Sequence, residues 1–248
     1  MEQGKVVVKE KNDSKMLKEI PCIRGVVFDL DGVLVNTELV FQQVGNELAR
    51  RRGKEMTLEV FKQMMGRRPR EAFTVMIELL ELHDDTPEEL QKESQQLFFE
   101  LLETLLEPMP GLLDLLETIE RAGLPKAVAT SSPRDYARRI LEKVELVHRF
   151  RFILGAEDVS HGKPHPEIYL KSAERLGIAP TEMLVVEDSE HGTKAAAASG
   201  AFVVAVPHQF SQHHDFSPAD YVAQALNDPV VLQIIEQQAA SEPERPCR

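Results

Sequence analysis

Residues 23–34 read IRGVVFDLDGVL, an apolar run followed by two closely spaced aspartates and a glycine. Val26, Val27 and Phe28 form a short apolar run with β-branched residues, which predicts a strand buried on both faces. The run ends at Asp29, and the sequence Asp-Leu-Asp-Gly leads away from it. We therefore expect a buried strand that delivers carboxylates to a functional loop.

Strands and helices alternate through the second half of the chain. Gly123 and Gly177 end two of the helices, as glycine commonly does. Such alternation implies a parallel sheet with helices on both faces. The predicted fold class is therefore α/β, with a doubly wound, Rossmann-like parallel sheet. The expected helices are 112–121, 133–146, 166–176 and 189–199, and the expected strands are 125–130, 150–154, 183–187 and 202–206.

A helix-rich insert interrupts this pattern directly after the first strand. Thr86, Pro87 and Glu89 form a strong helix start, and apolar residues then recur at helical spacing. Pro108–Gly111 closes the insert as a linker. We expect a core at 20–36 and 108–226, a helical cap at 37–107, an N-terminal extension at 1–19, and a C-terminal helix and tail at 227–248.

The composition limits the partners and the compartment. The chain has 248 residues, of which 42% are hydrophobic, and a net charge of -12, which disfavours nucleic acid and anionic membranes as partners. Cys22 and Cys247 are far apart and predict neither a disulfide nor a zinc site. No apolar run reaches the length of a signal peptide core or a membrane span. We expect a cytoplasmic protein that is a monomer or a weak homodimer.

Chemically active side chains follow the predicted strands where each strand ends. Ligands of open parallel sheets bind at these carboxyl ends, and carboxylates gathered there repel one another unless a cation lies among them. Oxygen ligands without His or Cys suit Mg²⁺, and a metal beside a lysine and hydroxyl groups suits a phosphoryl group. In chain order the residues are Asp29, Asp31, Thr130, Ser131, Ser132, Lys163, Glu187 and Asp188.

Each of these pieces alone has a simpler structural interpretation. Asp-x-Asp-Gly is usually a turn, Thr130–Ser132 can cap the following helix, Lys163 can be a solvated loop lysine, and Glu187–Asp188 can be another helix cap. A calcium EF-hand does not fit, because a strand precedes the acids and the later ligands are missing. The joint occurrence at successive strand ends is what favours one common site.

Four motifs together resemble the haloacid dehalogenase-like hydrolase superfamily. They are FDLDGVL at 28–34, VATSS at 128–132, GKPHP at 162–166 and VVEDS at 185–189. The resemblance runs from about residue 22 to residue 207. The position and helical character of the insert are similar to the small cap of the β-phosphoglucomutase-like and phosphatase branch.

The resemblance implies a role for each motif residue. Asp29 is the expected nucleophile that forms an aspartyl phosphate, and Asp31 is the expected proton donor that later helps to activate water. Thr130 and Lys163 are expected to hold the phosphoryl oxygens. The expected Mg²⁺ site comprises Asp29, Asp31, Glu187 and Asp188, and the expected substrate contacts in the core are Ser131 and Ser132.

Asp31 narrows the reaction that the resemblance implies. Relatives that remove halide lack this second acid, and relatives that cleave phosphonates replace it. The expected activity is a Mg²⁺-dependent phosphatase for a small phosphorylated metabolite, such as a sugar, polyol or nucleotide-related phosphate. A sugar-phosphate mutase is the alternative, although related mutases carry a histidine where this chain has Phe41. A non-catalytic binding module on the same fold is a third interpretation, which the complete set of motif residues disfavours.

A basic loop in the cap is a candidate contact for an anionic substrate. Arg67, Arg68 and Arg70 lie close together there, and arginine pairs well with phosphate. The alternative is a solvated helix start in which Arg70 pairs with Glu71 or Glu78. Loop histidines, His161 and His165 among them, lack paired spacing and are more typical of solvated side chains than of a transition-metal site.

Overall fold

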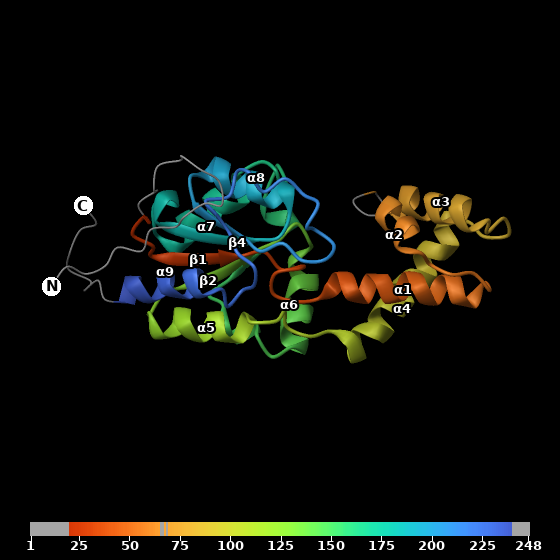
Figure 1. The fold of residues 1–248 in the computed structure, drawn as a ribbon, viewed down its shortest axis with the longest axis horizontal. Coiled ribbons are helices and arrows are strands. Elements are labelled where there is room, and N and C mark those ends of the chain that lie inside the picture. The colour runs from red at the N-terminus through yellow and green to blue at the C-terminus, as the bar shows by residue number, and fades with distance from the viewer. Residues whose placement is uncertain (1–19, 65–66, 68, 240–248) are drawn as a thin grey trace. The chain divides into compact units, whose positions relative to one another are not determined.

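The computed structural model describes residues 20–64, 67 and 69–239 (Figure 1). The expected extension at 1–19 and the end of the expected tail lie outside this range. The described chain divides into two compact units. The core unit comprises the described residues up to Val35 and from Pro108 onward, and the cap unit runs from Asn36 to Glu107.

The core unit is built on a six-stranded sheet in which every neighbouring pair is parallel. The strand order is β3-β2-β1-β4-β5-β6, so β1 lies between β2 and β4. All residues of β1 are buried, as the apolar run predicted. The strands are β1 Gly25–Phe28, β2 Lys126–Ala129, β3 Ile153–Leu154, β4 Met183–Glu187, β5 Phe202–Ala205 and β6 Tyr221–Val222.

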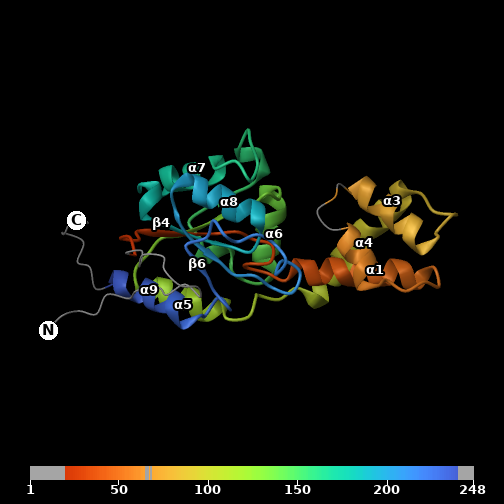
Figure 2. The same cartoon turned by 45° about the horizontal axis from the view of Figure 1, so that its top comes forward.

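Helices cover both faces of this sheet, which confirms the predicted doubly wound α/β fold. Helices α7 and α8 lie on one face, and α5 and α9 lie on the other (Figures 1 and 2). Val27, Val185 and Tyr169 belong to the apolar cluster that joins the sheet to α7 and α8. The core helices are α5 Leu112–Arg121, α6 Arg134–Lys143, α7 Glu167–Leu176, α8 Glu190–Ser199 and α9 Pro229–Ala239.

Some predicted elements are shorter in the structure, and one strand was not predicted. Helix α6 stops at Lys143, because Glu145 adopts a φ of 57° and a 3₁₀ turn follows at Val147–Arg149. Strand β3 is confined to two residues beside β2. Strand β6 is equally short and exists through its pairing with β5, which no local sequence pattern announces.

The cap unit contains four helices and no strand among its described residues. The predicted capping box is confirmed: the Thr86 hydroxyl accepts from the Glu89 N–H at 3.3 Å, and the Glu89 carboxylate accepts from the Thr86 N–H at 3.1 Å. These bonds satisfy N–H groups that a helix start leaves unpaired. The helices are α1 Thr37–Arg51, α2 Leu58–Met64, α3 Pro69–Leu80 and α4 Pro87–Leu105.

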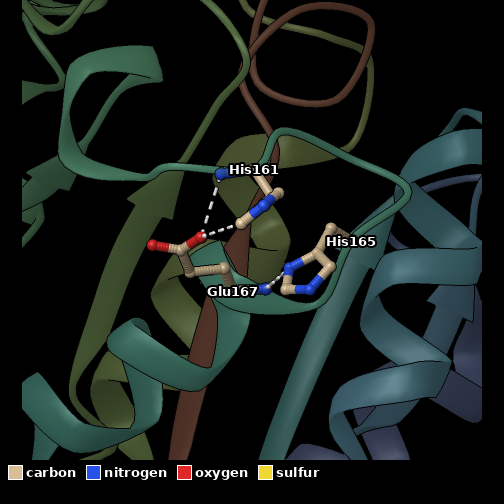
Figure 3. Close-up of side chains that lie close together, drawn as sticks. All are labelled: His161, His165 and Glu167. Atoms are coloured by element: carbon tan, nitrogen blue, oxygen red, sulfur yellow. Dashed lines mark hydrogen bonds and ion pairs between the residues drawn. The ribbon is translucent and has the colours of Figure 1, made fainter.

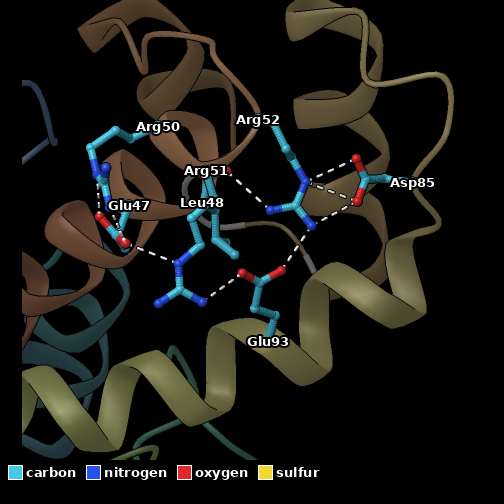
Figure 4. Close-up of polar contacts among 7 residues, drawn as sticks. All are labelled: Glu47, Leu48, Arg50, Arg51, Arg52, Asp85 and Glu93. Atoms are coloured by element: carbon cyan, nitrogen blue, oxygen red, sulfur yellow. Dashed lines mark hydrogen bonds and ion pairs between the residues drawn. The ribbon is translucent and has the colours of Figure 1, made fainter.

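An ionic network fastens α1 to α4 and to the loop before α4 (Figure 4). The Arg52 guanidinium donates to both oxygens of Asp85 at 2.7 to 2.8 Å and to Glu93 at 2.8 Å. Arg51 donates to the same Glu93 at 3.0 Å and to Glu47 at 2.9 Å. Because several charges share partners, the network is better placed to stabilise the cap than isolated surface pairs are.

Asn36 joins the two ends of the cap unit. Its side-chain amide donates to the Leu105 carbonyl at 3.1 Å, and its side-chain oxygen accepts from the Glu107 N–H at 2.8 Å. Its own backbone N–H donates to the Glu107 carbonyl at 3.2 Å. On the core side, Val35 and Pro108 form an isolated antiparallel bridge. The segments that enter and leave the cap are therefore bonded to each other.

Cys22 is disulfide-bonded, so the expectation that the cysteines form no disulfide is wrong. Separation along the sequence says little about distance in the fold: the N–H of Ile23 donates to the side chain of Gln238 at 3.0 Å. Within the part of the chain that the structure describes, no helix is both long enough and apolar enough to cross a bilayer.

Candidate active site

Three neighbouring strands deliver predicted site residues to the carboxyl edge of the sheet. Asp29 directly follows β1, Thr130 directly follows β2, and Glu187 is the last residue of β4. The N–H of Asp29 donates to the Val186 carbonyl at 3.0 Å, which continues the pairing of β1 with β4. All three predicted residues are buried. The sheet register therefore brings together residues that are far apart in the sequence.

Lys163 links these strands from the loop before α7. Its ammonium lies 2.5 Å from Asp29 Oδ1 and 2.6 Å from Glu187 Oε1, and it donates to the Ala129 carbonyl at 3.1 Å. Only 5% of its side chain is exposed. A buried ammonium is costly unless it is paired, so this lysine is held by its charge partners. The solvated-lysine interpretation is wrong.

The site carries more negative than positive charge. Burial raises the pKa of the Asp29 carboxyl well above its usual range, and Glu187 and Asp188 add to this rise while Lys163 opposes it. Burial acts to lower the pKa of Lys163, but the charges of Asp29 and Glu187 outweigh burial and raise it well above its usual value. One ammonium does not balance these acids, and a further cation would favour the ionised form of Asp29.

Glu187 is held tightly by groups of the protein. The Tyr169 hydroxyl donates to its Oε1 at 2.6 Å, and the Ser189 hydroxyl donates to its Oε2 at 3.0 Å. Burial acts to raise the pKa of Glu187, but the charge of Lys163 and hydrogen bonds from Lys163, the Tyr169 hydroxyl and the Ser189 N–H lower it overall. A Cβ atom at Gly192 would lie 1.8 Å from Glu187 Oε1, so the first turn of α8 requires glycine there.

Asp31 lies in the loop after β1 and is held by two hydroxyl groups. Ser132 Oγ donates to Asp31 Oδ2 at 3.0 Å, and the Tyr136 hydroxyl donates to Asp31 Oδ1 at 3.4 Å. Burial and the negative charge of Asp31 raise the pKa of Tyr136, so its hydroxyl stays protonated. The expectation that Ser132 caps the next helix is wrong: Pro133 occupies the cap position, with no side-chain bond.

Asp188 is paired with a histidine that the sequence analysis did not select. His208 Nε2 lies 2.9 Å from Asp188 Oδ2, and both side chains are largely buried. Gly32, with a φ of 78°, leaves room for this pair, because a Cβ atom there would lie 2.6 Å from Asp188 Oδ2. His208 lies three positions after the end of β5. A search for polar side chains just after the carboxyl end of each predicted strand would therefore have found it.

The residues present fit a divalent cation. Carboxylate oxygens of Asp29, Glu187 and Asp188 all lie within 4.8 Å of one another, and all three residues are buried. The donor set is made of hard oxygen atoms, which suits Mg²⁺ better than a transition metal. Asp29 and Glu187 already contact Lys163. A divalent cation here would neutralise the negative charge that this one ammonium leaves.

The remaining predicted contacts differ in their exposure. Thr130 is buried, and its hydroxyl accepts from the Ser132 N–H at 3.0 Å, whereas Ser131 is exposed. In the cap unit, Arg67 donates to the Gln63 carbonyl at 2.6 Å, and Arg70 lies 3.2 Å from Glu88. The candidate Arg68 falls outside the described residues. Substrate binding by Arg67, Arg68 and Arg70 stays a prediction.

The sequence is similar to a known protein family and to two phosphatases. Residues 26–206 match the haloacid dehalogenase-like hydrolase family. The chain is 33% identical over 181 residues to the phosphorylated carbohydrates phosphatase of Thermotoga maritima, covering 72% of this chain and 82% of that protein. It is 30% identical over 243 residues to the phosphoglycolate phosphatase of Shigella boydii, covering 83% of this chain and 90% of that protein.

Solved structures give the same relationship. A Thermotoga maritima structure provisionally named beta-phosphoglucomutase superposes with a TM-score of 0.75 at 29% identity, covering 87% of this chain and 99% of that one. The family match spans the strands that carry Asp29, Thr130 and Glu187 and the loop that carries Lys163. As the four motifs predicted, the chain belongs to the haloacid dehalogenase-like hydrolases.

Proposed function

We propose that this protein is a Mg²⁺-dependent phosphatase that hydrolyses a small-molecule phosphomonoester through an aspartyl phosphate on Asp29. One observation carries the proposal: the Asp29 carboxylate lies against the Lys163 ammonium at 2.5 Å, beside the carboxylates of Glu187 and Asp188. A dianionic phosphate can approach an aspartate only where cations neutralise the encounter. The named phosphatases among the relatives support this choice of reaction.

The reaction proceeds in two displacements at phosphorus. In the first, a carboxylate oxygen of Asp29 attacks phosphorus, the bond to the leaving oxygen breaks, and Asp31 gives that oxygen a proton. In the second, Asp31 takes a proton from water, and the resulting oxygen displaces Asp29 and releases phosphate. Ser132 and Tyr136 hold the Asp31 carboxylate in place during both proton transfers.

Charge stabilisation comes from the surrounding groups. Lys163 offsets negative charge on Asp29 and on the transferring phosphoryl group. Asp29, Asp188 and the backbone carbonyl of Asp31 are the proposed ligands of Mg²⁺, which when bound supplies further neutralisation of the phosphoryl oxygens. Glu187 supports this arrangement by holding Lys163 at 2.6 Å.

A sugar-phosphate mutase is the second candidate, favoured by the structural similarity to a provisionally named beta-phosphoglucomutase. Such an enzyme returns the phosphoryl group to a sugar rather than to water. Phe41, at the position where the related mutases carry histidine, stacks on Phe98 with ring centroids 4.4 Å apart. An apolar stacked ring supplies no proton transfer, so the phosphatase is the proposed activity.

The Asp29→Asn variant tests the nucleophile. We expect phosphate release to fall by about a thousandfold or more, because removal of a covalent nucleophile removes the reaction path. The exposed Asp84→Asn variant in the cap is the matched control and should keep wild-type turnover. Full activity of Asp29→Asn, or undiminished activity in excess chelator, would refute the proposal.

A panel of phosphorylated metabolites identifies the substrate class and separates the two candidate activities. Sugar, polyol and nucleotide-related phosphates are assayed for release of inorganic phosphate with Mg²⁺ present. β-Glucose 1-phosphate is assayed in parallel for glucose 6-phosphate, with a bisphosphate primer. Isomerisation without phosphate release would replace the phosphatase by the mutase.

A further inference from the structure

A second group of potential metal ligands lies on the loop that carries Lys163, outside the candidate active site. His161 and His165 stand two positions before and two positions after Lys163, and Glu167 is the first residue of α7 (Figure 3). Candidate ligand atoms of His161, His165 and Glu167 all lie within 4.8 Å of one another. Both histidines are exposed, so an ion can reach them from solvent.

The two imidazole rings lie close together. Their centroids are 4.7 Å apart, and the rings are tilted by 35°. His161 Nδ1 lies 3.3 Å from Glu167 Oε2, and His165 Nδ1 accepts from the Glu167 N–H at 3.3 Å. The Glu167 N–H lies at the start of α7 and has no hydrogen-bond partner within the helix. Water can therefore accept from this N–H when His165 Nδ1 binds an ion instead.

Glu167 is ionised and oriented for this role. Its Oε1 accepts from Lys171 at 2.7 Å and from the Ser160 N–H at 3.0 Å, while Oε2 faces His161. The hydrogen bond from Lys171 is the largest influence that lowers the pKa of Glu167 to about 2. Carboxylates that ligate metals are commonly fixed by such outer hydrogen bonds. Oε2 also accepts from the His161 N–H at 2.9 Å and keeps a second lone pair for an ion.

We propose that His161, His165 and Glu167 bind Zn²⁺ at a second metal site, distinct from the acidic site at the strand ends. Two imidazoles and one carboxylate suit Zn²⁺, which takes three protein ligands with water in the fourth position. Mg²⁺ prefers oxygen ligands and is not expected there. Because the histidines flank Lys163, the bound ion fastens the loop that presents the catalytic lysine.

Calorimetric titration with Zn²⁺ tests the site in a full-length Asp188→Asn background, which weakens the acidic site. One binding event is expected to remain in that background and to disappear when His161→Gln and His165→Gln are added. The matched control replaces the exposed His83 and His148 with glutamine, and zinc binding in the titration should then be unchanged. This result does not depend on catalysis, so it stands or falls separately from the proposed phosphatase.

Glu167→Gln supplies a finer test, because the amide oxygen keeps an acceptor for one of the two N–H groups, that of Ser160 or that of His161, while the anionic ligand is lost. Losing an outer partner of a ligand already weakens metal affinity by about tenfold, so loss of a direct ligand should weaken it at least that much. Hydrogen exchange of the backbone amides at 160–163 and 165 should slow on zinc addition in the wild type and in the Asp188→Asn background, and it should stay unchanged in the double histidine variant. Zinc binding that survives the double histidine variant, or anomalous density confined to Asp29 and Asp188, would overturn the proposal.

Discussion

Two charge clusters in this protein have the same composition and different surroundings. In the core unit, Lys163 pairs with Asp29 and Glu187, and side-chain exposure in this cluster ranges from 0 to 11%. In the cap unit, Arg52 pairs with Asp85 and Glu93, where exposure ranges from 18 to 24%. In each unit one cation contacts two carboxylates, and in the cap unit Arg51 shares one of them, Glu93.

The difference in burial separates the proposed catalytic arrangement in the core unit from a stabilising arrangement in the cap unit. Complete desolvation of an ion pair costs about as much as the pairing gains, so the core cluster is a weak source of stability. We propose that its role is electrostatic: the cluster carries excess negative charge, which a bound metal ion would offset when a phosphate binds. The cap cluster keeps contact with water, and its fork-shaped guanidinium contacts both acids and holds helices together.

Breaking the core cluster should give the largest effect. Lys163→Met leaves Asp29 and Glu187 buried without their cation, and the free energy of unfolding should fall by about 3 to 5 kcal/mol. Phosphate release should be abolished as well. Urea unfolding measures the free energy of unfolding, and a phosphate assay measures the rate of phosphate release. Lys194→Met is the matched control, because Lys194 makes an exposed i,i+4 pair with Glu190, and the free energy of unfolding should stay close to that of the wild type.

Crowding the core cluster should give the next largest effect. Gly192→Ala places a Cβ atom 1.8 Å from Glu187 Oε1, so the carboxylate that holds Lys163 must move. We expect a loss of about 1 to 3 kcal/mol in stability together with a lower kcat. Gly45→Ala in α1 is the control, since its Cβ would meet only the flexible end of Met56. Equal behaviour of the two variants would contradict this account of Glu187.

Breaking the cap cluster should give the smallest effect. Arg52→Gln removes the bonds to Asp85 and Glu93 and should lower the free energy of unfolding by about 1 kcal/mol, in line with a partly exposed network. Raising the salt concentration should shrink the difference from wild type. Arg138→Gln, which breaks a more exposed pair with Glu142, should be close to neutral. A loss as large as that of Lys163→Met would erase the distinction between the clusters.

Much of the core and its site could be predicted because the signals are local. Asp29, Thr130 and Glu187 each end a short apolar run, and the parallel topology then requires them to share one edge of the sheet. Strand β4 and helix α5 match the expected limits, since apolar runs and glycine stops define them. Lys163 was selected by its motif, and its burial follows from the charges that surround it.

Other features depend on contacts that leave no local trace. His208 pairs with Asp188 from a loop, and Tyr136 reaches Asp31 from the first turns of α6. Ser132 follows a strand and precedes a helix, which is the position of a cap, yet its hydroxyl turns to Asp31. Strand β6 is too short to show alternation. In each case a tertiary partner decides the outcome.

The bonding of Asn36 to Leu105 and Glu107 has an evolutionary consequence. The segments that enter and leave the cap are hydrogen-bonded to each other through this one residue. On the core side, Val35 and Pro108 form a β-bridge. An inserted module whose ends already meet can be exchanged, lengthened or trimmed without disturbing its host. The cap can therefore change in length and sequence while the residues at the sheet edge keep their positions.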